Sequence, residues 1–200
     1  MPEPQFLVVD CGSKKVDSIQ QIVSEFGFRT RKFPLDKIAQ LRIVDYAGVI
    51  ISGSPILLTE TDYSQHLRSL DFICSGRIPA LGICFGHQLI GLLYGARVFR
   101  GPECRGDQTV EIIDRDILFE GLDATLSLRE DHCEGITLPP EFVVLAKSRN
   151  YEVEAMKHRS KDVYGVQFHP EVSGETGKRI FNNFLNLSRE QPPVGPSRED

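Results

Sequence analysis

Short apolar runs that alternate with helical patterns constrain the fold of this chain more than any other feature. The runs at Phe6–Asp10, Phe28–Phe33, Tyr46–Pro55 and Ile78–Cys84 are typical of strands. Between the first two, apolar residues recur at helical spacing over residues 16–26. Strands that alternate with helices indicate an α/β protein with a doubly wound parallel sheet. In such sheets, ligands bind beyond the carboxyl ends of the strands.

The second half of the sequence is richer in strand patterns. We expect strands at Gln108–Ile113, Glu141–Ser148, Tyr151–His158 and Val163–Phe168, and a last helix from about Glu175 to Leu187. The predicted fold is therefore a doubly wound, mostly parallel sheet flanked by helices. Extra antiparallel strands are expected in its second half.

The length and composition indicate one globular domain with a tail. The chain has 200 residues, of which 40% are hydrophobic and 26% are charged. We place the domain at residues 1–188 and expect residues 189–200, which are rich in proline and charge, to be a disordered tail. A net charge of −5 without a block of basic residues argues against nucleic-acid or membrane binding. No apolar run approaches the length of a membrane span.

Cysteine usage argues against a disulfide framework. The chain has five cysteines, an odd number, and none of them forms a C-x-x-C pair. We therefore expect reduced thiols, a cytoplasmic location, and neither a zinc cage nor another cluster with metal-ligand spacing.

One cysteine lies where a nucleophile is expected. Cys84 stands between Gly82 and Gly86, directly after a strand pattern and before a helical one. Gly-x-Cys-x-Gly at a strand-to-helix turn has the form of a nucleophile elbow, in which glycines allow close approach of neighbouring elements. The start of the helix favours a thiolate and an oxyanion. The alternative is an inert core cysteine, which would not require the two glycines.

A thiolate nucleophile needs a base, and His169 is the best candidate. It follows the apolar strand pattern at Val163–Phe168, so it also lies at a strand end. Pro170 fixes the turn after it, and Glu171 can orient the imidazole ring. These residues predict a Cys84–His169–Glu171 triad. We interpret His87 as structural, because it lies on the helix after Cys84 and is expected to point away from the nucleophile.

The sequence resembles the class I glutamine amidotransferases. "GICFGHQLIG" and "YGVQFHPEV" are similar to that family's nucleophile and histidine motifs, and "VIISGSP" is similar to its oxyanion loop. The resemblance spans roughly Phe6 to Leu187. "LVVDCGS" and the region around "VEAMKH" are most similar to the glutaminase subunit or domain of GMP synthetases.

The resemblance implies a glutaminase that hydrolyses L-glutamine through a Cys84 thioester. Its ammonia would go to a separate synthetase subunit of the ATP-pyrophosphatase type, and the glutaminase itself would need no metal and no organic cofactor. The family's oxyanion loop and helix start correspond to the backbone N–H groups of Ser54 and Phe85. The glutamine-binding positions of the family correspond to the following residues: Gly53, Gln88, His132, Cys133 and Glu134.

Two departures from the family pattern leave alternative functions open. Ser54 stands where the family usually has glycine, and a serine would be strained there if the position needed a positive φ angle. In the segment at Asp131–Gly135, the family's usual serine and glycine are replaced by Asp131 and Cys133, while His132 and an acid, Glu134, are kept. The alternatives are a glutaminase of the anthranilate synthase type, a γ-glutamyl peptide hydrolase with the same triad, and a non-catalytic module.

Overall fold

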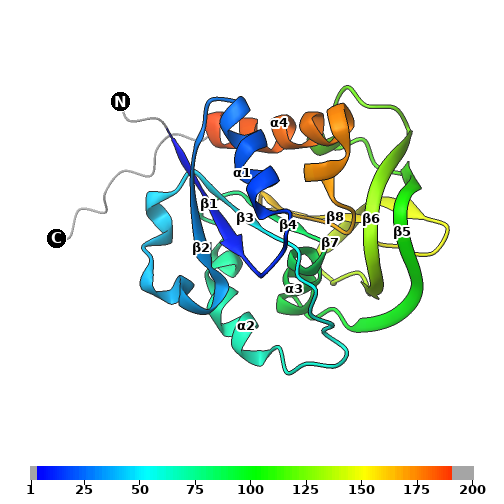
Figure 1. Ribbon diagram of the computed structural model, residues 1–200, viewed down its shortest axis with the longest axis horizontal. Coiled ribbons are helices and arrows are strands. Elements are labelled where there is room, and N and C mark those ends of the chain that lie inside the picture. Colours follow the sequence, from blue (N-terminus) through cyan, green and yellow to red (C-terminus); the bar gives the residue numbers. More distant parts are fainter. Residues whose placement is uncertain (1–3, 191–200) are drawn as a thin grey trace.

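A single sheet of nine strands runs through the molecule, with helices on both faces (Figure 1). This is a computed structural model, and it describes residues 4–190. The strand order is β2-β1-β3-β4-β9-β8-β7-β5-β6. The strands are β1 (Gln5–Asp10), β2 (Arg29–Pro34), β3 (Gly48–Ile51), β4 (Ala80–Ile83), β5 (Val98–Ile112), β6 (Thr125–Ile136), β7 (Phe142–Ser148), β8 (Ala155–His158) and β9 (Val163–Val166).

The first half of the sheet is parallel, as the sequence predicted. Strands β2, β1, β3, β4 and β9 all pair in parallel. β3, β4 and β9 are buried at every position, because helices cover both faces of the sheet. The doubly wound α/β fold is therefore confirmed, and the carboxyl ends of four central strands meet at one edge of the sheet.

Two helices cover each face of the sheet (Figure 1). α1 (Val16–Glu25) and α4 (Gly174–Glu190) lie on one face, and their apolar side chains share a core with alternate residues of β1 and β4. α2 (Ser64–Leu70) and α3 (Phe85–Leu93) lie on the other face with the 3₁₀ helix Leu35–Gln40. Helix α4 extends to Glu190, two residues beyond the predicted domain boundary; the predicted tail at residues 191–200 lies outside the described residues.

The antiparallel half is larger than the sequence indicated. β5 is 15 residues long rather than the short strand expected at Gln108–Ile113, and β6, which is 12 residues long, was not predicted. A bulge between Arg100 and Cys104 interrupts the register of β5, and the glycine and proline inside it obscured the strand pattern. β6 was obscured because it buries two polar residues, Glu130 and His132, at positions where apolar residues are normally found.

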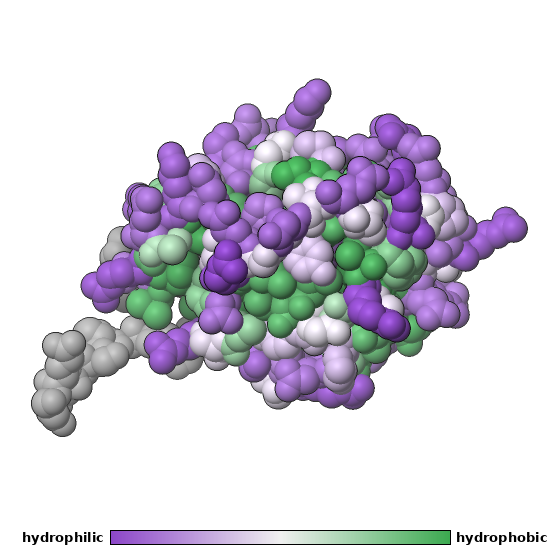
Figure 2. Space-filling model, turned by 90° about the horizontal axis from the view of Figure 1, so that it is seen from below, coloured by the Kyte–Doolittle hydropathy of each residue, from purple (hydrophilic) through white to green (hydrophobic). Residues whose placement is uncertain are grey.

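The surface contains both apolar and hydrophilic areas. Figure 2 shows the side on which α2 and α3 lie in Figure 1, where apolar residues gather in the middle and hydrophilic residues surround them. Among residues 4–190, no helix is both long and apolar enough to cross a membrane.

Candidate active site

Cys84 adopts a strained backbone conformation at the turn between β4 and α3. Its φ angle is 52°, and it is the only non-glycine residue with a positive φ among the described residues. A Cβ atom on Gly82 would lie 2.4 Å from the carbonyl oxygen of Gly86, and one on Gly86 would lie 2.4 Å from that of Ile51. Both flanking glycines are therefore required for close backbone packing, as the nucleophile-elbow pattern predicted.

The structure brings Cys84, His169 and Glu171 together. The Cys84 and His169 side chains lie side by side at the same cavity, and their interaction acts to raise the pKa of His169. The Nδ1 atom of His169 lies 2.7 Å from Oε1 of Glu171, and the side chains of both residues are nearly fully buried. Because Glu171 occupies Nδ1, the other ring nitrogen of His169 is left for the thiol. This is the arrangement that a nucleophile, a base and an orienting carboxylate require.

The surroundings of His169 favour its protonated form. Burial acts to lower the pKa of His169, but hydrogen bonds and charge from Cys84 and Glu171 outweigh it and raise the pKa well above the ordinary value for histidine. A protonated His169 beside Cys84 has a proton to donate to a leaving group.

A cavity of about 410 Å³ opens beside Cys84 and His169. It lies beyond the carboxyl ends of β1, β3, β4 and β9, where the fold predicts a ligand site. The loop after β1, the loop after β3, the start of α3, and the strands β5 and β6 all contribute to its walls. The lining residues are Gly12, Ser13, Lys14, Lys15, Ser54, Pro55, Ile56, Leu57, Cys84, Phe85, Gln88, Glu103, Arg105, Asp131, His132, Cys133, Glu134 and His169.

The loop after β3 lies against the Cys84–His169 pair. A Cβ atom on Gly53 would lie 3.1 Å from Cε1 of His169 and 3.6 Å from Cβ of Cys84, so Gly53 sits directly beside both side chains rather than in the cavity wall. Ser54 does line the cavity, and its φ angle is not positive. Its hydroxyl instead accepts a hydrogen bond from the N–H of Ile56 at 3.3 Å. The strain considered for a serine at this position is therefore absent.

Glu134 holds this loop in place. One carboxylate oxygen accepts a hydrogen bond from the N–H of Leu58 at 2.9 Å. The other accepts from the N–H and the hydroxyl of Thr59, at 2.8 and 2.5 Å. The carboxylate therefore joins the loop to β6. Glutamine binding by the backbone of this segment stays a prediction.

Gln88 lies in the cavity wall with its amide group fixed. Its Nε2 donates to the carbonyl oxygen of Glu134 at 3.0 Å and to Oε1 of Gln167 at 3.1 Å. Both amide hydrogens are therefore used inside the protein, which leaves the Gln88 oxygen as an acceptor for a ligand.

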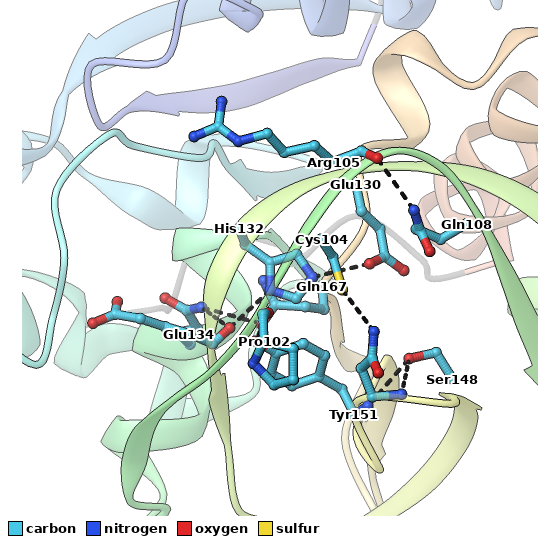
Figure 3. Close-up of polar contacts among 12 residues, drawn as sticks. Pro102, Cys104, Arg105, Gln108, Glu130, His132, Glu134, Ser148, Tyr151 and Gln167 are labelled. Carbon is cyan, nitrogen blue, oxygen red and sulfur yellow. Dashed lines mark hydrogen bonds and ion pairs between the residues drawn. The ribbon is translucent and has the colours of Figure 1, made fainter.

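Behind the cavity wall, polar residues of β5 and β6 form a buried cluster (Figure 3). Both ring nitrogens of His132 have partners within this cluster, and residue 132 also lines the cavity. Its ring lies 4.7 Å from that of Tyr151. Asn150 donates to Sγ of Cys104 at 3.3 Å, so Cys104 is buried in a polar environment.

A group of four ion-paired residues at the cavity was missed by the sequence analysis. Lys15 lies 3.2 Å from Asp131, and Arg105 lies near both Asp131 and Glu103. Burial acts to raise the pKa of Asp131, but the hydrogen bond and charge of Lys15, together with the charge of Arg105, outweigh it and lower the pKa. β5 and the loop after β1 contribute three of these side chains, and no sequence pattern placed those elements beside Cys84.

His87 is structural, in line with its interpretation from the sequence. It is fully buried on α3, and burial lowers its pKa to about 3, so the ring stays neutral. The ring occupies the space above Gly165, where a Cβ atom would lie 2.4 Å from Nδ1 of His87.

The fold and the geometry around Cys84 agree with the comparison to known families. The family model "Glutamine amidotransferase class-I" matches residues 7–187. The chain therefore belongs to the class I glutamine amidotransferase family, which confirms the family and the enzyme class that the motifs predicted.

Individual relatives and a solved structure show which members of the family this chain is similar to. The chain is 35% identical over 188 residues to the glutamine-hydrolysing GMP synthase subunit of Pyrococcus abyssi, with 92% of this chain and 98% of the relative covered. It is 42% identical over 172 residues to the protein of the same name from Methanothermobacter thermautotrophicus, with 84% and 87% covered. A crystal structure of a putative GMP synthase subunit from Thermoplasma acidophilum matches with a TM-score of 0.86 and 29% identity, covering 94% of this chain and 96% of that one.

Proposed function

We propose that this chain is the glutamine-hydrolysing subunit of a GMP synthase and that it supplies ammonia to a separate synthetase subunit. The observation that carries the proposal is the Cys84–His169–Glu171 arrangement at the cavity of a class I amidotransferase. The two relatives named above support GMP synthase as the enzyme to which this chain belongs, because they are GMP synthase subunits of nearly the same length as this chain.

In the first step, the Cys84 thiolate attacks the side-chain carboxamide carbon of glutamine. The resulting oxyanion is stabilised by backbone N–H groups at Ser54 and Phe85, each contributing about 3 kcal/mol to the transition state. The N–H of Phe85 is suited to this role because the first amides of α3 have no partner within the helix. His169 then donates its proton to the departing nitrogen, the carbon–nitrogen bond breaks, and ammonia leaves a γ-glutamyl thioester on Cys84.

In the second step, His169 acts as a base. It takes a proton from water as the water attacks the thioester carbon, and the carbon–sulfur bond breaks to release glutamate and the thiolate. Glu171 keeps the His169 ring oriented through both steps, because its bond to Nδ1 leaves the other nitrogen facing Cys84.

The cavity suits an amino acid with a polar side chain. Charged groups of both signs, Lys15, Asp131 and Arg105, lie in its wall and match the ammonium and carboxylate groups of glutamine. The oxygen of Gln88 is positioned to accept a hydrogen bond from the substrate amide. The five free cysteines fit a reducing compartment, and we assign the reaction to the cytoplasm.

The test is ammonia and glutamate release from L-glutamine by the purified chain, with and without a GMP synthase ATP-pyrophosphatase subunit. Cys84→Ala serves as the inactive control, and Cys74→Ser, which changes a partly exposed cysteine on another element, serves as the matched control. We expect turnover that is lost only in Cys84→Ala and that rises when the partner is present.

The other outcomes contradict the proposal at different points. Turnover that stays the same when the ATP-pyrophosphatase subunit is added would show that this chain does not act with that synthetase. Hydrolysis of γ-glutamyl peptides in preference to glutamine would indicate a peptide hydrolase with the same triad. Absence of reaction at Cys84 with a glutamine-analogue electrophile would indicate a non-catalytic module.

A further inference from the structure

Three potential metal ligands converge in the buried polar cluster behind the cavity (Figure 3). Sγ of Cys104, a carboxylate oxygen of Glu130 and a ring nitrogen of His132 all lie within 4.8 Å of one another. Cys104 and His132 face each other across the antiparallel strands β5 and β6, and Glu130 precedes His132 by two positions on the same face. The bulge after Arg100 shifts the register of β5 and so aligns Cys104 with His132.

The hydrogen bonds of His132 leave one nitrogen suited to a metal. Nδ1 lies 2.9 Å from the carbonyl oxygen of Glu134, which can only accept, so Nδ1 carries the hydrogen. In the neutral ring, Nε2 is then an acceptor, and it faces Oε2 of Glu130 at 3.2 Å, so a proton or a cation is needed between these two acceptors. Histidine ligands typically donate the other ring N–H to a backbone carbonyl in this way, which fixes the ring orientation.

The cluster also contains carboxylate oxygens without partners. Glu154 is completely buried, and neither of its oxygens has a hydrogen-bond partner in the part of the chain that the structure describes. The same holds for Oε1 of Glu130, which is 1% exposed. Buried carboxylate oxygens normally have a partner, and His132 is the only basic side chain paired with Glu130 among residues 4–190.

We propose that Cys104, Glu130 and His132 form a binding site for Zn²⁺. Sulfur, imidazole and carboxylate donors suit zinc, which takes four ligands in structural sites. Tetrahedral zinc places its ligand atoms about 3.5 Å apart, so the donors move together by about 1 Å on binding. The thiol of Cys104 releases its proton to solvent as the Zn–S bond forms.

A metal at this place would stabilise the wall of the glutamine cavity. His132 donates to the carbonyl oxygen of Glu134, and the same oxygen accepts from Gln88. A zinc ion on His132 would thus fix β6 against β5 beside the cavity. The site is separate from the proposed triad, and its test does not depend on glutamine hydrolysis.

The experiment is a Co²⁺ titration of the Cys84→Ala chain in a buffer with a reductant that contains no thiol. Cobalt replaces zinc and reports a bond to sulfur through a thiolate charge-transfer band in the near ultraviolet. Removing Cys84 excludes metal binding by the Cys84–His169 pair. We expect one equivalent of Co²⁺ to bind, with a thiolate band that is lost in Cys84→Ala/Cys104→Ser and kept in Cys84→Ala/Cys74→Ser. One equivalent of Zn²⁺ should displace the cobalt and raise the melting temperature.

Two results would overturn the proposal: no thiolate band from the Cys84→Ala chain, or a band that survives Cys104→Ser. Should the Cys104→Ser chain fail to fold, X-ray absorption of the Zn²⁺-loaded Cys84→Ala chain gives an independent answer. One sulfur at about 2.3 Å with nitrogen and oxygen ligands at about 2.0–2.2 Å is expected. A shell of oxygen ligands without sulfur would exclude the site.

Discussion

Replacing Glu134 by glutamine tests whether its carboxylate positions the loop after β3 or binds substrate. The carboxylate accepts three hydrogen bonds from the loop, two on one oxygen and one on the other. In Glu134→Gln, the amide oxygen can keep the two bonds from Thr59. The new NH₂ group then faces the N–H of Leu58, and two donors cannot form a hydrogen bond.

The expected loss of stability in Glu134→Gln follows from this one pair of donors that face each other. Losing one charge-assisted hydrogen bond and leaving a buried N–H without a partner costs about 2–3 kcal/mol. For a domain of this size, about 2 kcal/mol corresponds to a fall in melting temperature of roughly 4–8 °C. Because Ser54 lies on the same loop, the N–H that we propose to stabilise the oxyanion also loses its support. We therefore expect kcat for glutamine hydrolysis to fall along with stability.

Thermal unfolding and steady-state kinetics of Glu134→Gln measure both effects. Glu60→Gln is the matched control, because that carboxylate lies on the same loop but is 62% exposed, in an ion pair with Arg100. An exposed pair of this kind contributes little to stability. An unchanged melting temperature and kcat with a raised KM would refute the reasoning, since that result would place the carboxylate on the substrate.

Three further substitutions test the site. Ser54→Gly should not raise kcat/KM, because Ser54 is unstrained and caps the turn; a gain of several-fold would show that glycine is needed there. Gly86→Ala should lower the melting temperature by roughly 6–12 °C, because about 3 kcal/mol is lost when a Cβ meets the backbone of Ile51; an unchanged melting temperature would contradict that contact. Glu171→Gln removes one of the groups that raise the pKa of His169. The stability that the protonated ring contributes should then be lost at a lower pH, and the basic limb of Cys84 alkylation should move to lower pH; an unmoved limb would exclude Glu171 as the partner.

Local sequence patterns predicted the parallel half of the sheet and the elements around Cys84. The apolar runs of β1, β3 and β4 are continuous because both faces of these strands are buried, and such runs are easily recognised. The two glycines around Cys84 are required by contacts of 2.4 Å, so the pattern reflects a physical constraint. The placement of His169 beside Cys84 followed from the rule that parallel strands end at one edge.

The cavity wall formed by β5 and β6 could not be predicted in the same way. β6 contains charged and polar residues at buried positions, so the alternation of polar and apolar residues that marks a strand is broken at Glu130 and His132. The bulge in β5 adds a shift of register that no local rule specifies. The approach of Arg105 and Asp131 to Cys84 depends on that pairing, so both residues were missed.

The positions at which this chain departs from local rules are the positions that need a chemical explanation. Cys84 has a positive φ angle, which is unfavourable for any residue with a side chain and costs about 1–3 kcal/mol of stability. Its N–H donates to the carbonyl oxygen of Val166 at 2.8 Å, and its carbonyl oxygen accepts from the N–H of Gln88 at 3.1 Å, so the surrounding structure maintains the strain at the proposed nucleophile. The second departure is the burial of Glu130 and Glu154, two carboxylates with unpaired oxygens in the described structure. A cation bound by Cys104, Glu130 and His132 would give the buried Glu130 carboxylate a partner, and the metal titration tests this explanation.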